Sequence, residues 1–317
     1  MIVVAGESLV DLIVREDGSV AATPGGGPYT VARALGRLER PVAFLGRISA
    51  DRFGRILRAR LAGDGVDVSL APSTDEPTLL AVAELDADGS ARYRFHSAGT
   101  AAVGLVPSDL EGGALPAGAT VLHVGSLGFV LEPMAATIET LVAGARSDVL
   151  VMADPNCRPA AITDEPAYRA RLGRLLARTD IVKVSTDDLA WLSPDLDPGA
   201  AARRLIAAGP RVVLVTDGGR PVRIVTTAHD TVLDVPPVRV VDSVGAGDSF
   251  GAGFLAAWTA AGRGRAELDD PAAVEDATRF AIVVGAKTAA RAGADPPTLA
   301  ELGDGTPGWS SLRPRVP

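Results

Sequence analysis

Residues 242–250, Asp-Ser-Val-Gly-Ala-Gly-Asp-Ser-Phe, constrain the fold of this chain more than any other stretch. Before them, the run Val-Arg-Val-Val at 238–241 is rich in β-branched residues and predicts a short strand. After them, residues 251–261 are mostly small and apolar and predict a helix. The sequence therefore predicts a turn of small residues between a strand and a helix, with an aspartate in the first helical turn.

Such a turn has the chemistry of an anion site. Gly245, Ala246 and Gly247 allow the backbone to approach a ligand closely. Their N–H groups lie at a helix N-terminus, where they lack partners and the helix dipole favours negative charge, as on a phosphate. Asp248 would then lie beside the anion and accept the proton of an attacking hydroxyl. A glycine-rich turn capped by an aspartate is the simpler alternative.

Apolar runs of strand length alternate with helical segments along most of the chain. The runs at 2–5, 121–125, 149–154, 181–185 and 211–216 are strand-like, and 134–145 and 272–290 are helical. This alternation predicts a parallel sheet with right-handed crossovers. Ligands of such sheets bind at the carboxyl ends of the strands, where Asp-Pro-Asn-Cys-Arg-Pro at 154–159 is expected.

Composition excludes several classes of protein. The 317 residues allow one large or two ordinary domains, and the net charge of −8 argues against a nucleic-acid partner. Cys157 is the only cysteine, which excludes an internal disulfide and a thiolate metal site. Neither a basic leader nor an apolar run of membrane-spanning length is present, so the sequence predicts a cytoplasmic protein without a membrane partner.

Other local signals have structural interpretations. Asp51 precedes a helical segment and predicts an N-cap. Ala-Asp-Gly at 87–89 predicts a hairpin turn between two alternating segments. His123 lies in an apolar strand and is expected to be a core residue with its hydrogen bonds satisfied.

The stretch at 242–250, continued through Ala-Gly-Phe-Leu at 252–255, resembles the C-terminal signature of the PfkB (ribokinase-like) family of sugar kinases. The glycines at 25–27 resemble the family's N-terminal signature, and Asp-Pro-Asn-x-Arg at 154–158 resembles its fructokinase-like branch. The resemblance implies one α/β domain over residues 1–317, a three-layer sandwich around a mostly parallel sheet. It also implies a small β-sheet lid, with strands at about 9–23 and 66–96, and a loose tail at 303–317.

The resemblance assigns roles to individual residues. It implies that Asp248 is the catalytic base and that the amides of Gly245, Ala246 and Gly247 stabilise the transferred phosphoryl group. The sugar is expected to contact Asp11, Gly26, Gly27, Thr30 and Arg158, with Asn156 close by. Thr30 departs from the family, which usually has Asn there; Thr offers a single hydroxyl where Asn offers a donor and an acceptor.

ATP and Mg²⁺ are the cofactors that the resemblance implies. The residues expected at the nucleotide are Lys183, Ser185, Thr216, Gly218 and Gly247. Asp188 is expected to bind Mg²⁺ through water, in a Ser-x-x-Asp string where the family often has Ser-x-x-Glu. As an isolated motif, that string is typical of a helix N-cap. Asp242 is the expected ligand of a monovalent cation such as K⁺.

The implied reaction is transfer of the γ-phosphoryl group of ATP to a sugar hydroxyl, with fructose as the first expectation. A 2-keto-3-deoxygluconate-type acid, ribose or a nucleoside, and a catalytically weak sugar- or nucleotide-binding protein are the alternatives. A serine-hydrolase elbow at 247–251 is discounted because no histidine follows Ser249, and no Gly-Lys-Ser/Thr phosphate loop occurs. The open lid sheet favours a homodimer contact.

Overall fold

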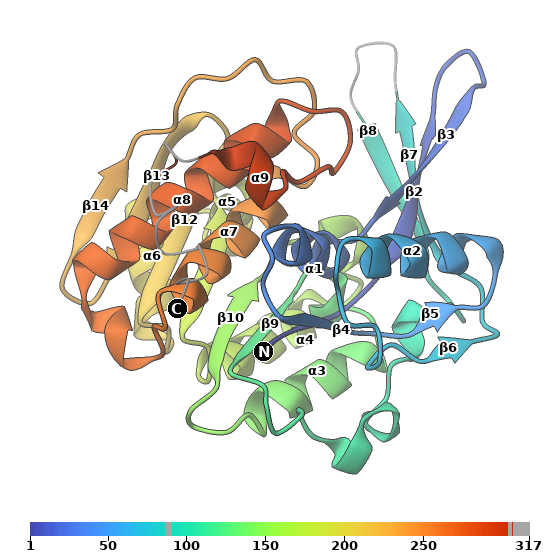
Figure 1. Ribbon diagram of the computed structural model, residues 1–317, viewed down its shortest axis with the longest axis horizontal. Helices are drawn as coiled ribbons and strands as arrows, with labels where there is room; N and C mark the ends of the chain where they lie inside the picture. The colour runs from blue at the N-terminus through green and yellow to red at the C-terminus, as the bar shows by residue number, and fades with distance from the viewer. Residues whose placement is uncertain (86–90, 304–305, 307–317) are drawn as a thin grey trace.

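An eight-stranded sheet forms the centre of the computed structural model, which describes residues 1–85, 91–303 and 306 (Figure 1). Its order is β14-β13-β12-β11-β10-β9-β1-β4. The strands from β12 to β4 run parallel, and β13 and β14 extend the β12 edge in antiparallel fashion. The strands are β1 (Ile2–Ala5), β4 (Val42–Leu45), β9 (Val121–Gly125), β10 (Leu150–Asp154), β11 (Ile181–Ser185), β12 (Val212–Asp217), β13 (Arg220–Thr226) and β14 (Asp230–Leu233).

Helices cover both faces of this sheet and make a three-layer sandwich, as expected. Side chains of α1 (Gly27–Arg37), α2 (Arg52–Gly63), α7 (Ala246–Ala260), α8 (Pro271–Ala289) and α9 (Leu299–Leu302) pack in one core. Side chains of α3 (Met134–Ala143), α4 (Glu165–Leu176), α5 (Thr186–Leu192) and α6 (Pro198–Ala207) pack in the other. The central strands are apolar on both faces because each face is covered; in β1, Val4 enters the first core and Val3 the second.

A second sheet of four strands rises from one end of the molecule (Figure 1). Its order is β3-β2-β7-β8, with β2 (Leu9–Val14), β3 (Val20–Gly25), β7 (Leu79–Leu85) and β8 (Ala91–His96). Asp11 in β2 pairs in register with Thr23 in β3 and with Ala81 in β7. Since paired residues share a face of a sheet, this register aligns Asp11 with Ala81 and then with Phe95 of β8.

Two sequence expectations about strands are wrong. Residues 238–241 form no strand, because the N–H groups of Val241 and Asp242 both donate to Ala289 O at the end of α8 and no strand lies alongside. Residues 66–68 do not belong to the small sheet, because Asp67 bridges to Ala43 of β4. A separate two-stranded sheet pairs β5 (Ile48–Ser49) with β6 (Ser73–Thr74), and β6 is the strand that precedes β7 in the chain.

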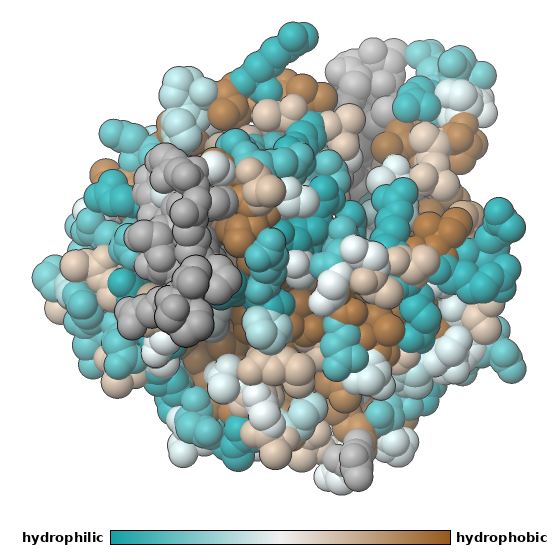
Figure 2. Space-filling model, viewed as in Figure 1, coloured by the Kyte–Doolittle hydropathy of each residue, from teal (hydrophilic) through white to brown (hydrophobic). Residues whose placement is uncertain are grey.

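Several local expectations are confirmed, and others lie outside the described residues. Asp51 caps α2 by accepting a hydrogen bond from Gly54 N at 2.7 Å. The predicted turn at 87–89 lies outside the described residues, as does the tail at 303–317 apart from Gly303 and Thr306. Figure 2 shows a face on which hydrophilic and apolar residues are interspersed. Among the described helices, none has both the length and the hydrophobicity that a bilayer span requires.

Candidate active site

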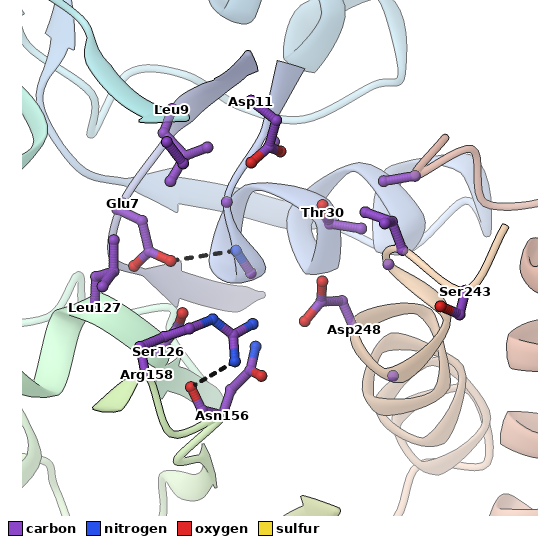
Figure 3. Close-up of a pocket in the computed structure, with 18 of the residues that line it drawn as sticks. Glu7, Leu9, Asp11, Thr30, Ser126, Leu127, Asn156, Arg158, Ser243 and Asp248 are labelled. Carbon is purple, nitrogen blue, oxygen red and sulfur yellow. Dashed lines mark hydrogen bonds between the residues drawn. The ribbon is translucent and has the colours of Figure 1, made fainter. Parts of the chain in front are cut away.

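A cavity of ≈ 600 Å³ lies where α1 and α7 begin, beside the carboxyl ends of the central strands and one face of the small sheet (Figure 3). The glycine-rich segments of both signatures line it. Every residue expected at the sugar also lines it: Asp11, Gly26, Gly27, Thr30 and Arg158. The fold therefore brings together segments more than two hundred residues apart in the sequence, as the strand-end rule for parallel sheets predicts.

The N-terminus of α7 presents open backbone donors to this cavity. Gly245 caps the helix in the left-handed conformation, with φ 75°, which an L side chain adopts only with strain. Among the described residues, the N–H groups of Gly245, Gly247 and Asp248 have no hydrogen-bond partner. Ala246 differs from the expectation: its N–H donates to Ser243 O at 3.2 Å, so this amide holds the turn and is not open to a ligand.

Asp248 lies in the first turn of α7 and faces the start of α1. A Cβ built on Gly27 would lie 3.3 Å from Asp248 Oδ1 and 3.5 Å from Asn156 Nδ2, so these two side chains flank the backbone of Gly27. Burial raises the pKa of Asp248 to about 7, and the nearby charge of Asp154 adds to the effect. A carboxylate with this pKa is matched to accepting a proton near neutral pH.

Thr30 lines the cavity from α1, where it is buried, and its hydroxyl has no hydrogen-bond partner among the described residues. Its methyl carbon points toward α7, since a Cβ on Gly245 would lie 3.1 Å from Thr30 Cγ2. Asp11 enters from β2, and burial raises its pKa to about 6. Thr30 and Asp11 thus offer a hydroxyl and a carboxyl group to the hydroxyls of a small polar ligand.

Arg158 contributes a positive charge to the lining of the cavity. Its Nη1 donates to Asn156 O at 3.1 Å and to Cys157 O at 3.2 Å, which anchors the guanidinium on its own turn. Within the described part of the chain it forms no ion pair, and Figure 3 shows its head facing the space beside Asp248. Its positive charge lowers the pKa values of Glu7, Asp11 and Asp248, although burial outweighs it at all three.

Glu7 is a cavity residue to which the sequence analysis gave no role. It lies two residues after the end of β1 and is only 1% exposed. Its Oε1 accepts a hydrogen bond from Gly27 N at 3.2 Å, while Oε2 is buried without a partner (Figure 3). Burial raises the pKa of Glu7 to about 7. The strand-end rule would have found this residue, because Glu7 follows the carboxyl end of β1, which runs parallel beside β9.

Two other lining residues adopt backbone conformations that non-glycine residues rarely take. Ser126 has φ 55° and Asn156 has φ 39°, and they follow the neighbouring strands β9 and β10. Such strain concentrates at functional sites. Cys157, between Asn156 and Arg158, faces away: its N–H donates to Asp188 Oδ1, and burial raises the pKa of its thiol to about 12.

Lys183 and Asp154 form a buried ion pair beneath the cavity, with 3.0 Å between Nζ and Oδ2. Burial alone would lower the pKa of Lys183, but Asp154 and then Asp248 outweigh it and raise the pKa. His123, two strands away, is a core residue as expected but is not satisfied, since neither ring nitrogen has a partner. Burial lowers its pKa to about 3, so it is neutral.

The residues expected at the nucleotide divide into two groups. Lys183 and Gly247 line the cavity, whereas Ser185, Thr216 and Gly218 lie outside its lining, at the carboxyl ends of β11 and β12. Asp188 forms a capping box with Ser185: its Oδ2 accepts from Ser185 N and Oγ, and its Oδ1 from Cys157 N. Both oxygens are thus engaged, and the neighbouring Asp187 lines the cavity instead.

No cluster of three or more metal-ligating side chains occurs among the described residues. Asp242, the expected ligand of a monovalent cation, links two loops: its Oδ1 accepts from Val244 N and its Oδ2 from Gly293 N, both at 2.9 Å. Mg²⁺ keeps several waters and is commonly bound through substrate phosphates with one or two carboxylates. The residues present fit a magnesium ion that arrives with the phosphates of a nucleotide.

Comparison with known proteins gives consistent matches over most of the chain. A model of the pfkB family of carbohydrate kinases matches residues 1–301. The fructokinase of Rhizobium leguminosarum bv. trifolii is 35% identical over 260 residues, which are 81% of this chain and 79% of that protein.

Solved structures agree with the sequence matches. The fructokinase of Xylella fastidiosa with bound ATP superposes with a TM-score of 0.84 at 27% identity, covering 92% of this chain and 93% of that one. A double mutant of the fructokinase from Vibrio cholerae O395, in a form that binds fructose, ADP and a potassium ion, has a TM-score of 0.82 at 25% identity, with 92% and 93% covered.

Proposed function

The chain belongs to the pfkB family of carbohydrate kinases, and we propose that it phosphorylates fructose with Asp248 as the base. It is an ATP-dependent sugar kinase, a phosphotransferase that acts on a sugar hydroxyl, with fructose as the favoured acceptor. One observation carries the assignment of the base: Asp248 and the open amides of α7 face the same cavity as Asp11, Thr30 and Arg158.

The chemistry follows from this placement. Asp248 accepts the proton of the sugar hydroxyl while that oxygen bonds to the γ-phosphorus of ATP. The bond between the γ-phosphorus and the oxygen that bridges it to the β-phosphate breaks, and ADP leaves with that bridging oxygen. The N–H groups of Gly245 and Gly247 stabilise the charge on the transferred phosphoryl oxygens. A Mg²⁺ ion bound with the nucleotide would neutralise phosphate charge.

Sugar binding is assigned to the opposite wall. Asp11 accepts two sugar hydroxyls, Thr30 donates or accepts one hydrogen bond, and the backbone of Gly26 and Gly27 packs against the ring. Arg158 orients the sugar or neutralises the phosphate. The small sheet acts as a lid that closes over the substrates and excludes water, because an open site would hydrolyse ATP.

Three further proposals concern partners of the site. Lys183 contacts the nucleotide phosphates, with Ser185, Thr216 and Gly218 on the side of β11 and β12. A monovalent cation such as K⁺ binds near Asp242. The lid sheet also mediates a homodimer: Leu12, Val14 and Val82, on its face opposite Asp11, are only partly buried. Analytical ultracentrifugation would test the dimer.

A coupled ADP-release assay with MgATP tests the function. Fructose, 2-keto-3-deoxygluconate, ribose, tagatose and adenosine form the panel. The rate should depend on the added sugar and be highest with fructose. A sugar-dependent rate only with 2-keto-3-deoxygluconate would assign Arg158 to a substrate carboxylate instead. No rate with any acceptor, while ATP still binds, would contradict the proposed reaction.

The pH dependence of kcat/KM should follow the ionisation of Asp248. The base works only when ionised, so its raised pKa predicts full activity above pH 7 and a loss through pH 7 as the pH falls. At pH 6 about one-tenth of the plateau value should remain. Rates for the sugar at saturating MgATP between pH 5 and 9 would measure this limb.

The control for that profile is Glu7→Gln, since the pKa of Glu7 is also raised to about 7. The limb should persist in this variant. Its disappearance would assign the limb to Glu7 and not to Asp248.

Thr30→Val should raise KM for the sugar by about threefold to tenfold, the value of one neutral hydrogen bond, with kcat little changed. Valine keeps the methyl group that faces Gly245 and removes only the hydroxyl. Thr278→Val is the matched control, because that buried hydroxyl bonds only to Val274 O within α8. Equal KM values for wild type and Thr30→Val would show that the hydroxyl does not bind the sugar.

A further inference from the structure

The buried pair beneath α7 has a geometry that stability alone does not explain. Asp154 and Lys183 are each 4% exposed, and Asp154 Oδ1 has no partner although it is fully buried. A buried ion pair with an unsatisfied oxygen contributes little to stability, because desolvation of two charges offsets their attraction. A role in the chemistry of the neighbouring site would explain why this pair is buried there.

The position of Lys183 is set by Gly247. A Cβ on residue 247 would lie 2.8 Å from Lys183 Nζ, so the ammonium group reaches the underside of the helix N-terminus only because this residue is glycine. Among the described residues, Lys183 Nζ makes one hydrogen bond, to Asp154, and forms no ion pair with Asp248. Two of its three donors thus remain beside the base and the open amides.

The charges that face Asp248 come from several elements. Asp154 of β10 and Asp11 of β2 disfavour its ionised form, and Lys183 of β11 and Arg158 of the turn after β10 favour it. From α1, only the uncharged Gly27 and Thr30 line the cavity next to it. After Asp154, Asp248 is the carboxylate with the largest effect on Lys183. Without Asp154, an ion pair between the freed ammonium and Asp248 would make Asp248 a weak base.

We propose that Asp154 is a positioning residue that holds Lys183 away from Asp248 and so preserves the basicity of the catalytic carboxylate. Asp154 touches no substrate in this scheme; it acts on Asp248 through the lysine and through its own charge. The inference rests on the proposed role of Asp248, and its test reads the ionisation of Asp248 directly, so that it does not depend on turnover.

The test is a titration of the free protein labelled with ¹³C at the aspartate carboxyl groups. The Asp248 signal is identified by its absence in Asp248→Asn. In Asp154→Asn the midpoint of Asp248 should fall by at least about one pH unit relative to wild type. In the double variant Asp154→Asn/Lys183→Met the midpoint should return toward the wild-type value, because the charge pair is then removed as a unit.

The chain offers matched controls, since Lys287 is its only other lysine and bonds to Glu301 O at the end of α8. Asp180 is 2% exposed, at the opposite end of β11, where it pairs with Arg265. Lys287→Met and Asp180→Asn should leave the Asp248 midpoint unchanged.

An unchanged or raised midpoint in Asp154→Asn would overturn the inference, as would a lowered midpoint that persists in the double variant. Where the wild type is an active kinase, the acid limb of kcat/KM should move with the NMR midpoint. A wild type without kinase activity would contradict the proposed function and leave the titration result standing on its own.

Discussion

Asp248→Asn is expected to lower turnover by about 10²–10⁴-fold, the range lost when a general base is removed. Asparagine keeps the shape of the side chain and the start of α7, so the open amides of Gly245 and Gly247 remain in place. Nucleotide binding should therefore change little. Turnover measured by ADP release and nucleotide affinity measured by calorimetry separate the two effects.

Asp276→Asn is a suitable control, since Asp276 lies on α8 and pairs with Arg263 away from the cavity. Its turnover should match that of the wild type. Near-normal turnover in Asp248→Asn would refute the assignment of the base, whichever sugar is the substrate.

Gly245→Ala is expected to be the most damaging change of a single small residue at the site. A side chain at φ 75° costs about 1–2 kcal/mol. The new Cβ would also lie 2.7 Å from Ala294 Cβ and 3.1 Å from Thr30 Cγ2, and such overpacking costs a further ~1–3 kcal/mol. Relief of the contact moves the N-terminus of α7, and loss of one aligned donor should lower kcat by about 10²-fold.

The control is Gly262→Ala at the other end of α7. Gly262 has φ 69°, but nothing lies within 4 Å of the Cβ that would be added. The Gly262→Ala variant should lose only the stability that the strained backbone conformation costs, and its turnover should equal that of the wild type. Urea unfolding and the ADP assay measure both properties. Equal losses of stability and kcat in the two variants would show that crowding against Thr30 and Ala294 does not matter.

Much of the site was predictable because it follows from short segments at the ends of predictable elements. The amides of Gly247 and Asp248 are open because a helix leaves its first N–H groups without intrahelical partners. Asn156 and Arg158 were expected at the cavity because they follow β10, whose carboxyl end lies at the ligand-binding edge of the parallel sheet. Asp11 comes instead from β2 of the small sheet and Asp248 from the start of α7, and the family signatures predicted their places. Neither argument needs side-chain packing.

Two local patterns each had two possible outcomes. Residues 238–241 have strand propensity, yet propensity makes no strand without a neighbouring strand, and here the chain crosses to the end of α8. In Ser-Thr-Asp-Asp at 185–188, the third helical residue folds back on the cap, so Asp188 is occupied and Asp187 faces the cavity. A partner distant in the sequence, Ala289, decided the first case. In the second, the cap at Ser185 is local and only the contact with Cys157 is distant.

The sequence by itself determined the sandwich fold, the anion-binding turn and the carboxylate beside it, because periodicity, helix-end chemistry and a family signature are local properties. Only the tertiary structure showed that Asp154 pairs with Lys183 under Gly247 and that Glu7 is buried against Gly27. These contacts set the charge of the site. They form because side chains from separate strands are buried next to one another. Burial and the distances between charges govern pKa values, and both exist only in the folded chain.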